Sequence, residues 1–457
     1  MDDVTGSIAS FVDGLTAEAL DASAIHEVKR RVVDSFGCIV GGRGGEPARI
    51  ARQLASQSQG RLSATAVGLE TKTTVELAAF ANTVMVRYLD YNDMYFTPRG
   101  GGQHPSDLIP AALATGEALG VRGVDVLLSI VIAYEVGAAL AGATRIRERG
   151  WDQGTFTVVA AAMGAGKLLG LSREQLAHAA SIAVTSNIAT RQTRVGQLSM
   201  WKGSATAAAN RNGIFAALLA REGMTGPSEP FVGKDGIMDL ITGPFTLDLA
   251  VPHTRPFVAE VSGLKFHPAE YNSQSALDVI LRLRDRVPVD QIEDIHVETY
   301  WVAYSEIGME PAKWDPRTRE TADHSLPYLL AAALLDGRIT PDSFSPDRIA
   351  DPQLRSLMPR ISVAERPDFS RRFPGELNAR IIVRLRSGQT IEGQAAHPHG
   401  HAKHPLTDDE VNEKCDALCA SVRDRKLCRE LKDALWAFES LDNVADVLGS
   451  LGRLTAS

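Results

Sequence analysis

The stretch VDVLLSIVIAYEVGAALA, residues 124–141, decides which kind of fold to expect. Its most apolar part, residues 126–134, is followed directly by Glu135. That part is shorter than the roughly 20 apolar residues that a membrane-spanning helix needs. Small residues fill the rest of the stretch, and they allow neighbouring helices to pack closely. The stretch therefore predicts a buried helix within a helical core.

Other segments of the first 260 residues have the same helical character. Apolar residues recur at helical spacing at Ile25, Val28, Val32 and Val33, and Gly41-Gly42 is expected to end that helix. Further helices rich in small residues are predicted at 76–88, 108–119, 124–141, 156–169 and 173–185. No alternation of apolar and polar residues between turn signals is found here, so the sequence predicts no strands in this part.

The pattern changes after about residue 261. One more amphipathic helix is predicted around 276–283, and residues 294–299 then alternate as a strand does. A second alternating segment, 379–385, turns through Ser387-Gly388-Gln389 into a third at 390–394. Between them, residues 324–335 read as a helix that Gly337 caps. Residues 262–400 are therefore predicted to form a smaller α+β domain.

A capping box, Thr407-x-x-Glu410, opens a last helical segment. Helices that follow an inserted α+β unit are expected to pack back on the first helical domain. The predicted fold is mainly α. It has a large helical domain at 1–261, completed by C-terminal helices at 401–457, with the α+β domain inserted between them.

Composition limits the kinds of molecule that this protein is expected to bind. The 457 residues carry 48 Lys and Arg against 56 Asp and Glu, a net charge of −8, without the clustered basic face of a nucleic-acid-binding protein. The acidic start lacks the pattern of a signal peptide, and the four cysteines lack zinc spacing. We expect reduced thiols, a cytoplasmic location, and no membrane or nucleic-acid partner. An acidic chain can still bind an anionic substrate if Lys, Arg and His gather at one site.

Two motifs invite functional interpretations that their context does not favour. Residues 164–170, GAGKLLG, lack both the spacing and the strand–turn–helix context of a nucleotide loop, so a helix crossing is the simpler interpretation. The four histidines between His397 and His404 lie in a loop with Pro398 and Pro405. A metal site needs ligands held by further hydrogen bonds, so we predict a solvated loop there.

Polar segments at five places are more informative. LDYND, residues 89–93, ends an apolar helix, and a Gly-rich loop then leads to HPSD, residues 104–107, where a helix N-terminus favours an anion. Lys202 lies among small and apolar residues, residues 265–272 are dense in acid–base groups, and Tyr328 follows DHSLP. Each segment also has an ordinary structural interpretation: a capped helix, a surface lysine whose stem packs on apolar groups, or a core phenol with one hydrogen bond.

Taken together and in order, these segments resemble the MmgE/PrpD family, which includes 2-methylcitrate dehydratase and cis-aconitate decarboxylase. The matching pieces span nearly the whole chain: VVDSFGCIVGG (32–42), LDYND (89–93), GQHPSD (102–107), MWKGSA (200–205), KFHPAEYNSQ (265–274), DHSLPY (323–328) with LLDG (334–337), and HPLTDDEV (404–411). The resemblance implies a helical domain built from both chain ends with an inserted α+β lid. It also implies a homodimer, an active site between the domains, and neither a metal nor another cofactor.

The resemblance also implies the site residues, motif by motif. The catalytic residues that it implies are Asp90, His104, Lys202, Lys265 and Tyr328. Neighbouring polar residues of the same segments are predicted to bind the substrate: Asn92, Asp93, Ser106, His267, Glu270 and His324. The substrate is then a small carboxylic acid.

The reaction that we expect is elimination of water from a hydroxy-tricarboxylate such as 2-methylcitrate, because a weakly acidic proton beside a carboxylate needs a positioned base and nearby cations. Lys202, Lys265 and His104 are expected to hold carboxylates. His104 and Tyr328 are the acid–base candidates, and Asp90 is expected to orient His104 or a substrate hydroxyl.

Three alternatives stay open. A cis-aconitate-type decarboxylase is disfavoured, because family members of that type carry His where this chain has Trp151-Asp152 and Glu270. The long segment between LDYND and HPSD resembles a dehydratase, although Met94 stands where members commonly have Thr. An epimerase or isomerase of a small amino- or imino-dicarboxylate would use Lys265 and Tyr328 on opposite faces of one carbon. The third alternative is a catalytically silent helical dimer used for binding.

Overall fold

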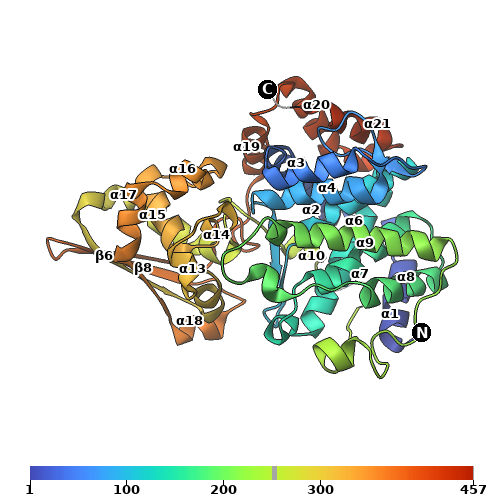
Figure 1. The fold of residues 1–457 in the computed structure, drawn as a ribbon, viewed down its shortest axis with the longest axis horizontal. Helices are drawn as coiled ribbons and strands as arrows, with labels where there is room; N and C mark the ends of the chain where they lie inside the picture. The colour runs from blue at the N-terminus through green and yellow to red at the C-terminus, as the bar shows by residue number, and fades with distance from the viewer. Residues whose placement is uncertain (250–254, 456–457) are drawn as a thin grey trace.

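Helices form most of the structure, as residue spacing predicts. The computed structural model describes residues 1–249 and 255–455 and has two units side by side (Figure 1). The larger unit contains helices from both ends of the chain: α1 (Asp3–Gly14), α2 (Ala22–Gly42), α3 (Glu46–Ala55), α4 (Val75–Tyr88), α5 (Ile109–Leu119), α6 (Gly123–Ala143), α7 (Gly154–Leu168), α8 (Arg173–Thr185), α9 (Trp201–Arg221), α10 (Val258–Val261), α19 (Asp408–Cys419), α20 (Arg425–Trp436) and α21 (Ala445–Leu448). The mainly-α fold class is confirmed.

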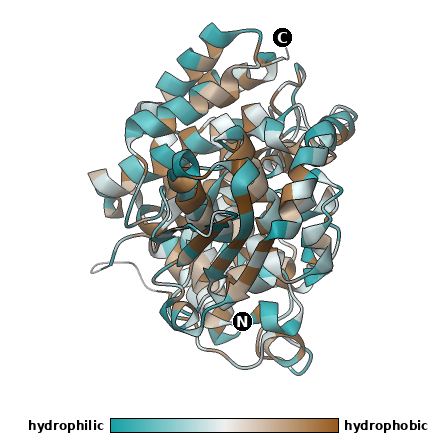
Figure 2. Cartoon of the chain, turned by 90° about the vertical axis from the view of Figure 1, so that its left-hand side faces the viewer, coloured by the Kyte–Doolittle hydropathy of each residue, from teal (hydrophilic) through white to brown (hydrophobic). Residues whose placement is uncertain are grey.

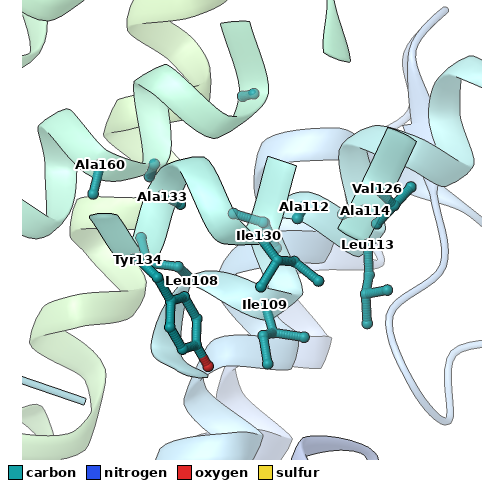
Figure 3. Packing of buried hydrophobic residues seen from close by; sticks show 14 of the residues in the cluster. Leu108, Ile109, Ala112, Leu113, Ala114, Val126, Ile130, Ala133, Tyr134 and Ala160 are labelled. Atoms are coloured by element: carbon teal, nitrogen blue, oxygen red, sulfur yellow. The ribbon is translucent and has the colours of Figure 1, made fainter. Parts of the chain in front are cut away.

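Helix α6 lies in the core of the larger unit and packs against α5 and α7 (Figure 3). By length and composition α6 could cross a membrane, but 83% of its apolar window is buried inside the structure. Helix α6 has 21 residues and is therefore longer than the apolar part of its sequence, residues 126–134, indicated. On α7, a side chain at Gly164 would meet the Ser129 carbonyl of α6 at 3.1 Å. Gly164 therefore serves a helix crossing, as predicted for this segment.

The smaller unit is a four-stranded sheet covered by helices. Its strand order is β7 (Ile361–Glu365), β6 (Ile292–Thr299), β8 (Ala379–Leu385) and β9 (Thr390–Ala395), with only the β7–β6 pair parallel. Buried and more exposed residues alternate along β8, and the strands near the centre of Figure 2 carry both hydrophobic and hydrophilic residues. Helices α11 (Gln274–Leu283) and α15 (Leu326–Asp336) pack against the sheet. Short helices complete the unit: α12 (Trp301–Ala303), α13 (Pro311–Trp314), α14 (Arg319–Ala322), α16 (Pro346–Ile349), α17 (Pro352–Leu357) and α18 (Pro367–Arg372).

Short strands in the larger unit contradict the prediction that this part has none. Strands β3 (Asp93–Phe96), β4 (Gly102–Gln103) and β5 (Gly263–Leu264) form one small sheet, and β1 (Ser63–Ala64) pairs with β2 (Thr73–Thr74). Such strands are too short to show an alternating pattern. Within the β3–β4 turn Gly100 has φ +85°, which favours glycine. This hairpin connects the LDYND segment, which ends at the start of β3, to His104, which follows β4.

Two buried apolar clusters correspond to the two units. The first joins residues between Val4 and Leu264 to the tail residues Leu406–Leu454, and the second lies between Ala269 and Ile391. Helix α19 begins with the predicted capping box of Thr407 and Glu410 and packs on α2. The four cysteines are buried and unpaired. Action of the smaller unit as a lid stays a prediction.

Candidate active site

A cavity of about 290 Å³ is lined by residues of both units. The larger unit contributes the hairpin around Gly100 and His104, Gln153 just before α7, and Ala141, Phe156 and Lys202 from helices α6, α7 and α9. The smaller unit contributes Glu270, Asn272, Glu306 and His324. Seven Lys or Arg residues line the cavity (Arg99, Arg145, Arg147, Arg191, Arg194, Lys202 and Lys313), against four acids (Glu148, Asp152, Glu270 and Glu306). The cavity therefore favours an anionic ligand.

Asp90 is the centre of a buried ion network behind this cavity. Its φ of 49° is the one positive φ of a non-glycine residue in the described ranges, and such backbone strain is typical of functional sites. Lys265 Nζ holds this conformation through hydrogen bonds to the Asp90 carbonyl, at 2.8 Å, and to its carboxylate, at 2.7 Å. Lys202 Nζ lies 3.1 Å from Asp90 Oδ1 and Arg87 Nη2 lies 3.3 Å from the same oxygen.

This network holds more positive than negative charge, because three cationic side chains contact the single carboxylate of Asp90. Burial opposes ionisation of Asp90, yet Lys202, Lys265 and Arg87 together hold the pKa of this carboxyl well below its usual value. Burial lowers the pKa of Lys265, whose side chain is fully enclosed. Lys202 is 2% exposed and also lines the cavity, so it is a buried cation and not a surface lysine.

Asp93, Asn92 and Ser106 form a second polar cluster that supports the hairpin. Ser106 donates from its backbone and its hydroxyl to Asp93 Oδ1, at 2.9 and 2.6 Å, and the Tyr134 hydroxyl donates to Asp93 Oδ2 at 2.9 Å. Asn92 donates to Ser106 Oγ at 2.8 Å. Burial raises the pKa of Asp93 to about 6. None of these three predicted substrate-binding residues lines the cavity, so the structure places them as support for His104.

His104 lies at the cavity with a defined tautomer. Its Nδ1 is 2.7 Å from the Asp93 carbonyl oxygen. Because a carbonyl only accepts, Nδ1 carries the proton and Nε2 keeps its lone pair. Burial, reinforced by the charges of Arg87 and Lys265, holds the pKa of His104 well below its ordinary value. His104 is therefore a neutral imidazole that can accept a proton.

Glu270 and His324 bring titratable groups from the smaller unit to the same cavity. The Glu270 carboxylate accepts from the Asn272 backbone at 2.6 Å and from the Asn272 side chain at 2.7 Å. Burial raises the pKa of Glu270 to about 7. His324 Nδ1 lies 2.5 Å from Asp323 Oδ1, and burial holds the pKa of this imidazole well below its usual range. Glu270 is thus poised to hold or to give a proton near neutral pH.

Two residues expected at the site point elsewhere. Tyr328 is fully buried in the core of the smaller unit, where its hydroxyl donates to the Ser343 carbonyl at 2.5 Å. It does not line the cavity, so the structure does not bring it together with His104 and Lys202, and the acid–base role expected of it stays a prediction. His267 Nε2 lies 3.2 Å from Asp278 Oδ1 and also lies outside the cavity lining. The expected contact between Asp90 and His104 is absent from the hydrogen bonds of the described residues, where Asp90 binds cations.

The sequence did not identify several charged residues of the cavity, among them Arg147, Arg191, Arg194, Glu306 and Lys313. Arg147 lies in the 3₁₀ turn Ile146–Arg149, and Arg191 and Arg194 lie in the turn Arg191–Arg194. Arg147 and Arg191 both pair with Glu306 of the smaller unit, and Arg194 pairs with Asp152. The basic clusters RIRER (145–149) and RQTR (191–194) could have indicated an anion site, but such clusters are also typical of ordinary surface turns.

The histidine-rich loop forms no metal site in the structure. Across 1–249 and 255–455, no group of three or more His, Cys, Asp or Glu side chains is arranged to hold a metal ion. His399 instead pairs with Glu410 of α19 at 3.0 Å and stacks on Phe266. The loop connects the sheet to the tail helices.

Comparisons with known proteins cover nearly the whole chain. The MmgE/PrpD N-terminal domain matches residues 6–250 and the MmgE/PrpD C-terminal domain matches residues 267–439. A cis-aconitate decarboxylase-like protein of Aspergillus oryzae is 27% identical over 97% of this chain and 96% of its own length. Human cis-aconitate decarboxylase is 27% identical over 92% of this chain and 88% of its own. The 2-methylcitrate dehydratase of Salmonella typhi is 26% identical over 71% of each chain.

Proposed function

The chain belongs to the MmgE/PrpD family, and on this premise we propose that it is a lyase that eliminates water from a hydroxy-tricarboxylate such as 2-methylcitrate. Relatives with named activities are 2-methylcitrate dehydratases and cis-aconitate decarboxylases. Both kinds of name denote a lyase acting on a polycarboxylic acid. The cation-rich cavity supports a substrate of this class.

One observation carries the choice of reaction: a neutral base and a protonatable acid line the same cavity from different units. His104 Nε2 has a free lone pair because Nδ1 donates to the Asp93 carbonyl. In the proposed reaction it removes the proton beside a substrate carboxylate. Glu270, with a pKa of about 7, protonates the departing hydroxyl, which leaves as water. Each proton transfer contributes about 10²- to 10⁴-fold to the rate.

Cations supply the remaining stabilisation. As the proton leaves, negative charge develops on the neighbouring carboxylate, and preorganised positive groups in a water-poor site lower the energy of that state. Lys202 lines the cavity and is held in place by Asp90. Lys265 acts through Asp90, because it binds both the backbone and the carboxylate of this strained residue.

Acidic residues at two positions support dehydration over decarboxylation. By resemblance, decarboxylases of the family carry histidine where this chain has Trp151-Asp152 and where it has Glu270, and both Asp152 and Glu270 line the cavity. Asp152 is paired with Arg194. The protonated form of Glu270 suits a leaving hydroxyl.

The first experiment follows ultraviolet absorbance after mixing purified protein with 2-methylcitrate, with citrate in parallel, and with and without a chelator. A rising conjugated-alkene signal is expected, and persistence of the signal with the chelator would support a metal-independent reaction. A flat trace from folded protein would refute 2-methylcitrate as the substrate. Deuterium entering a dicarboxylate from solvent without alkene formation would then favour an epimerase or isomerase, and release of carbon dioxide from cis-aconitate would favour a decarboxylase.

We also propose that two copies associate. Trp201 and Phe215 of α9 are 50% and 54% exposed, and a spacing of 14 residues places them near the same side of the helix. Large exposed apolar groups of this kind are typical of interaction surfaces. Light scattering of wild type and Phe215→Ser is the test: a dimer that Phe215→Ser weakens supports the proposal, and a monomeric wild type refutes it.

A further inference from the structure

Lys313 has an unusual environment for a charged residue. It lies on α13 in the smaller unit, is 1% exposed, and lines the cavity. Among the described residues its ammonium group makes no hydrogen bond and no ion pair. Burial lowers its pKa. An unpartnered ammonium in an enclosed site is costly, and packing alone gives no reason for it.

Arg191, another residue of the cavity lining, has a buried donor without a partner. Arg191 Nη1 is buried and has no hydrogen bond, although Arg191 Nη2 pairs with Glu306. Arg147 Nη2 lies 3.1 Å from the same Glu306 oxygen, Oε1. One carboxylate thus serves two arginines, and Glu306 comes from the smaller unit while both arginines come from the larger one.

We propose that Lys313, Arg191 and Arg147 form a subsite for a further carboxylate of the substrate, in which Glu306 acts as a built-in counter-ion. This inference rests on the proposed function and adds that the substrate carries a carboxylate remote from the reacting carbon. The incoming carboxylate pairs with Lys313 and with the free Arg191 Nη1. It shares or takes over the arginine contacts that Glu306 holds in the empty site.

The charges explain why the subsite selects polycarboxylates. Lys202 already has Asp90 as its partner at 3.1 Å, so it and His104 serve the reacting end. Lys313 has no ion-pair partner among the described residues; the charges of Glu310 and Glu306 act on it electrostatically, and Glu310 Oε2 already accepts from the Gly196 backbone at 3.2 Å. A ligand with one carboxylate leaves Lys313 unpaired, whereas a ligand with two or three neutralises it.

Tricarballylate tests the subsite apart from the reaction, because it has three carboxylates but no hydroxyl to lose. Its dissociation constant would be measured by calorimetry for wild type, Lys313→Met and Glu306→Gln, with the exposed Lys426→Met as control. Loss of a charge-assisted contact is expected to weaken binding to Lys313→Met about ten- to a hundred-fold. Glu306→Gln, which removes the competing counter-ion, is expected to bind more tightly, and the control to bind like wild type.

Each outcome decides one part of the inference. Unchanged binding to folded Lys313→Met overturns the subsite, and weaker binding to Glu306→Gln overturns the counter-ion role. Lys313→Arg keeps the charge and is expected to retain binding, so it gives a second reading should the methionine variant not fold. If wild type binds tricarballylate through Lys313 but no hydroxy acid is dehydrated, the reaction is refuted and the subsite stands. If dehydration occurs with an unchanged KM in Lys313→Met, the subsite alone is refuted.

Discussion

Glu270 gives the sharpest test of the acid–base assignment, because the direction of its pH dependence depends on its role. Burial favours the neutral carboxyl and raises its pKa to about 7. If the neutral form is the active one, kcat is full at low pH and falls as pH rises through about 7. The protonated fraction is about one half at pH 7, about a tenth at pH 8 and about a hundredth at pH 9, since each unit above the pKa lowers it tenfold.

The assay is the initial rate of alkene formation at saturating 2-methylcitrate between pH 6 and pH 9. For Glu270→Gln we expect kcat to drop about 10²- to 10⁴-fold, because an amide does not donate the required proton. The residual rate is expected to lack the falling limb near pH 7. Glu293→Gln, an exposed substitution on β6, should leave both the rate and the limb unchanged.

Substitution of the neighbouring Glu306 tests whether Glu270 causes the fall of kcat near pH 7. The charge of Glu306 raises the pKa of Glu270, so Glu306→Gln is expected to move the falling limb to lower pH. A kcat that rises through pH 7 in wild type would refute the assignment, because Glu270 would then act in its ionised form. A limb that persists unchanged in Glu270→Gln would assign it to another residue.

Three further substitutions test the rest of the site. Lys265→Ala should abolish turnover and keep the fold, because Asp90 retains two other cations; normal kcat with an unchanged circular dichroism spectrum would refute the site assignment. Lys414→Met should lower the free energy of unfolding in urea by about 3–5 kcal/mol, because the buried Asp34 loses its partner at 2.7 Å; an unchanged urea midpoint would contradict this. Tyr328→Phe should cost only about 1 kcal/mol of stability with kcat unchanged, and a hundred-fold loss of kcat would restore its catalytic role.

Helices were predictable from this sequence because each carries its own periodic signal. The segment 173–185 matches α8 residue for residue, and 379–385 matches β8. Strand β7 was missed, because it has five residues and reaches β6 only through a long crossover. Sequence spacing carries no information on which distant segments pair.

The site shows the same division between local and long-range information. Asp90, Lys202 and Lys265 lie in three separate segments, and only the family resemblance indicated that they meet. For Lys202 the local sequence left a surface position open, and burial with Asp90 excluded it. The sequence also did not predict the direction in which a side chain points. Tyr328 lies only four residues after His324, yet His324, which precedes helix α15, lines the cavity whereas Tyr328, inside the helix, enters the core.

The charged residues that the sequence missed share a physical cause. Arginines in short turns usually contact solvent and contribute little to stability, so a run such as RQTR gives no reason to expect buried donors. The smaller unit supplies Glu306 as the partner of Arg191, whereas Arg194 pairs with Asp152 of the larger unit. The role of Arg191 therefore depends on a contact with a residue more than a hundred positions away in the sequence.

Lys313 allows function and stability to be separated in one variant. A buried ammonium without a partner destabilises the folded chain, and natural sequences retain such costs mainly where function requires them. Lys313→Met keeps a similar length and removes the charge, so we expect its melting temperature without ligand to rise while tricarballylate binding weakens. A structural lysine would behave differently, because its loss would lower the melting temperature and leave affinity per folded molecule unchanged. Opposite signs of the two changes would therefore show that Lys313 is kept to bind an anion, and a fall in both would show that it has an intramolecular partner.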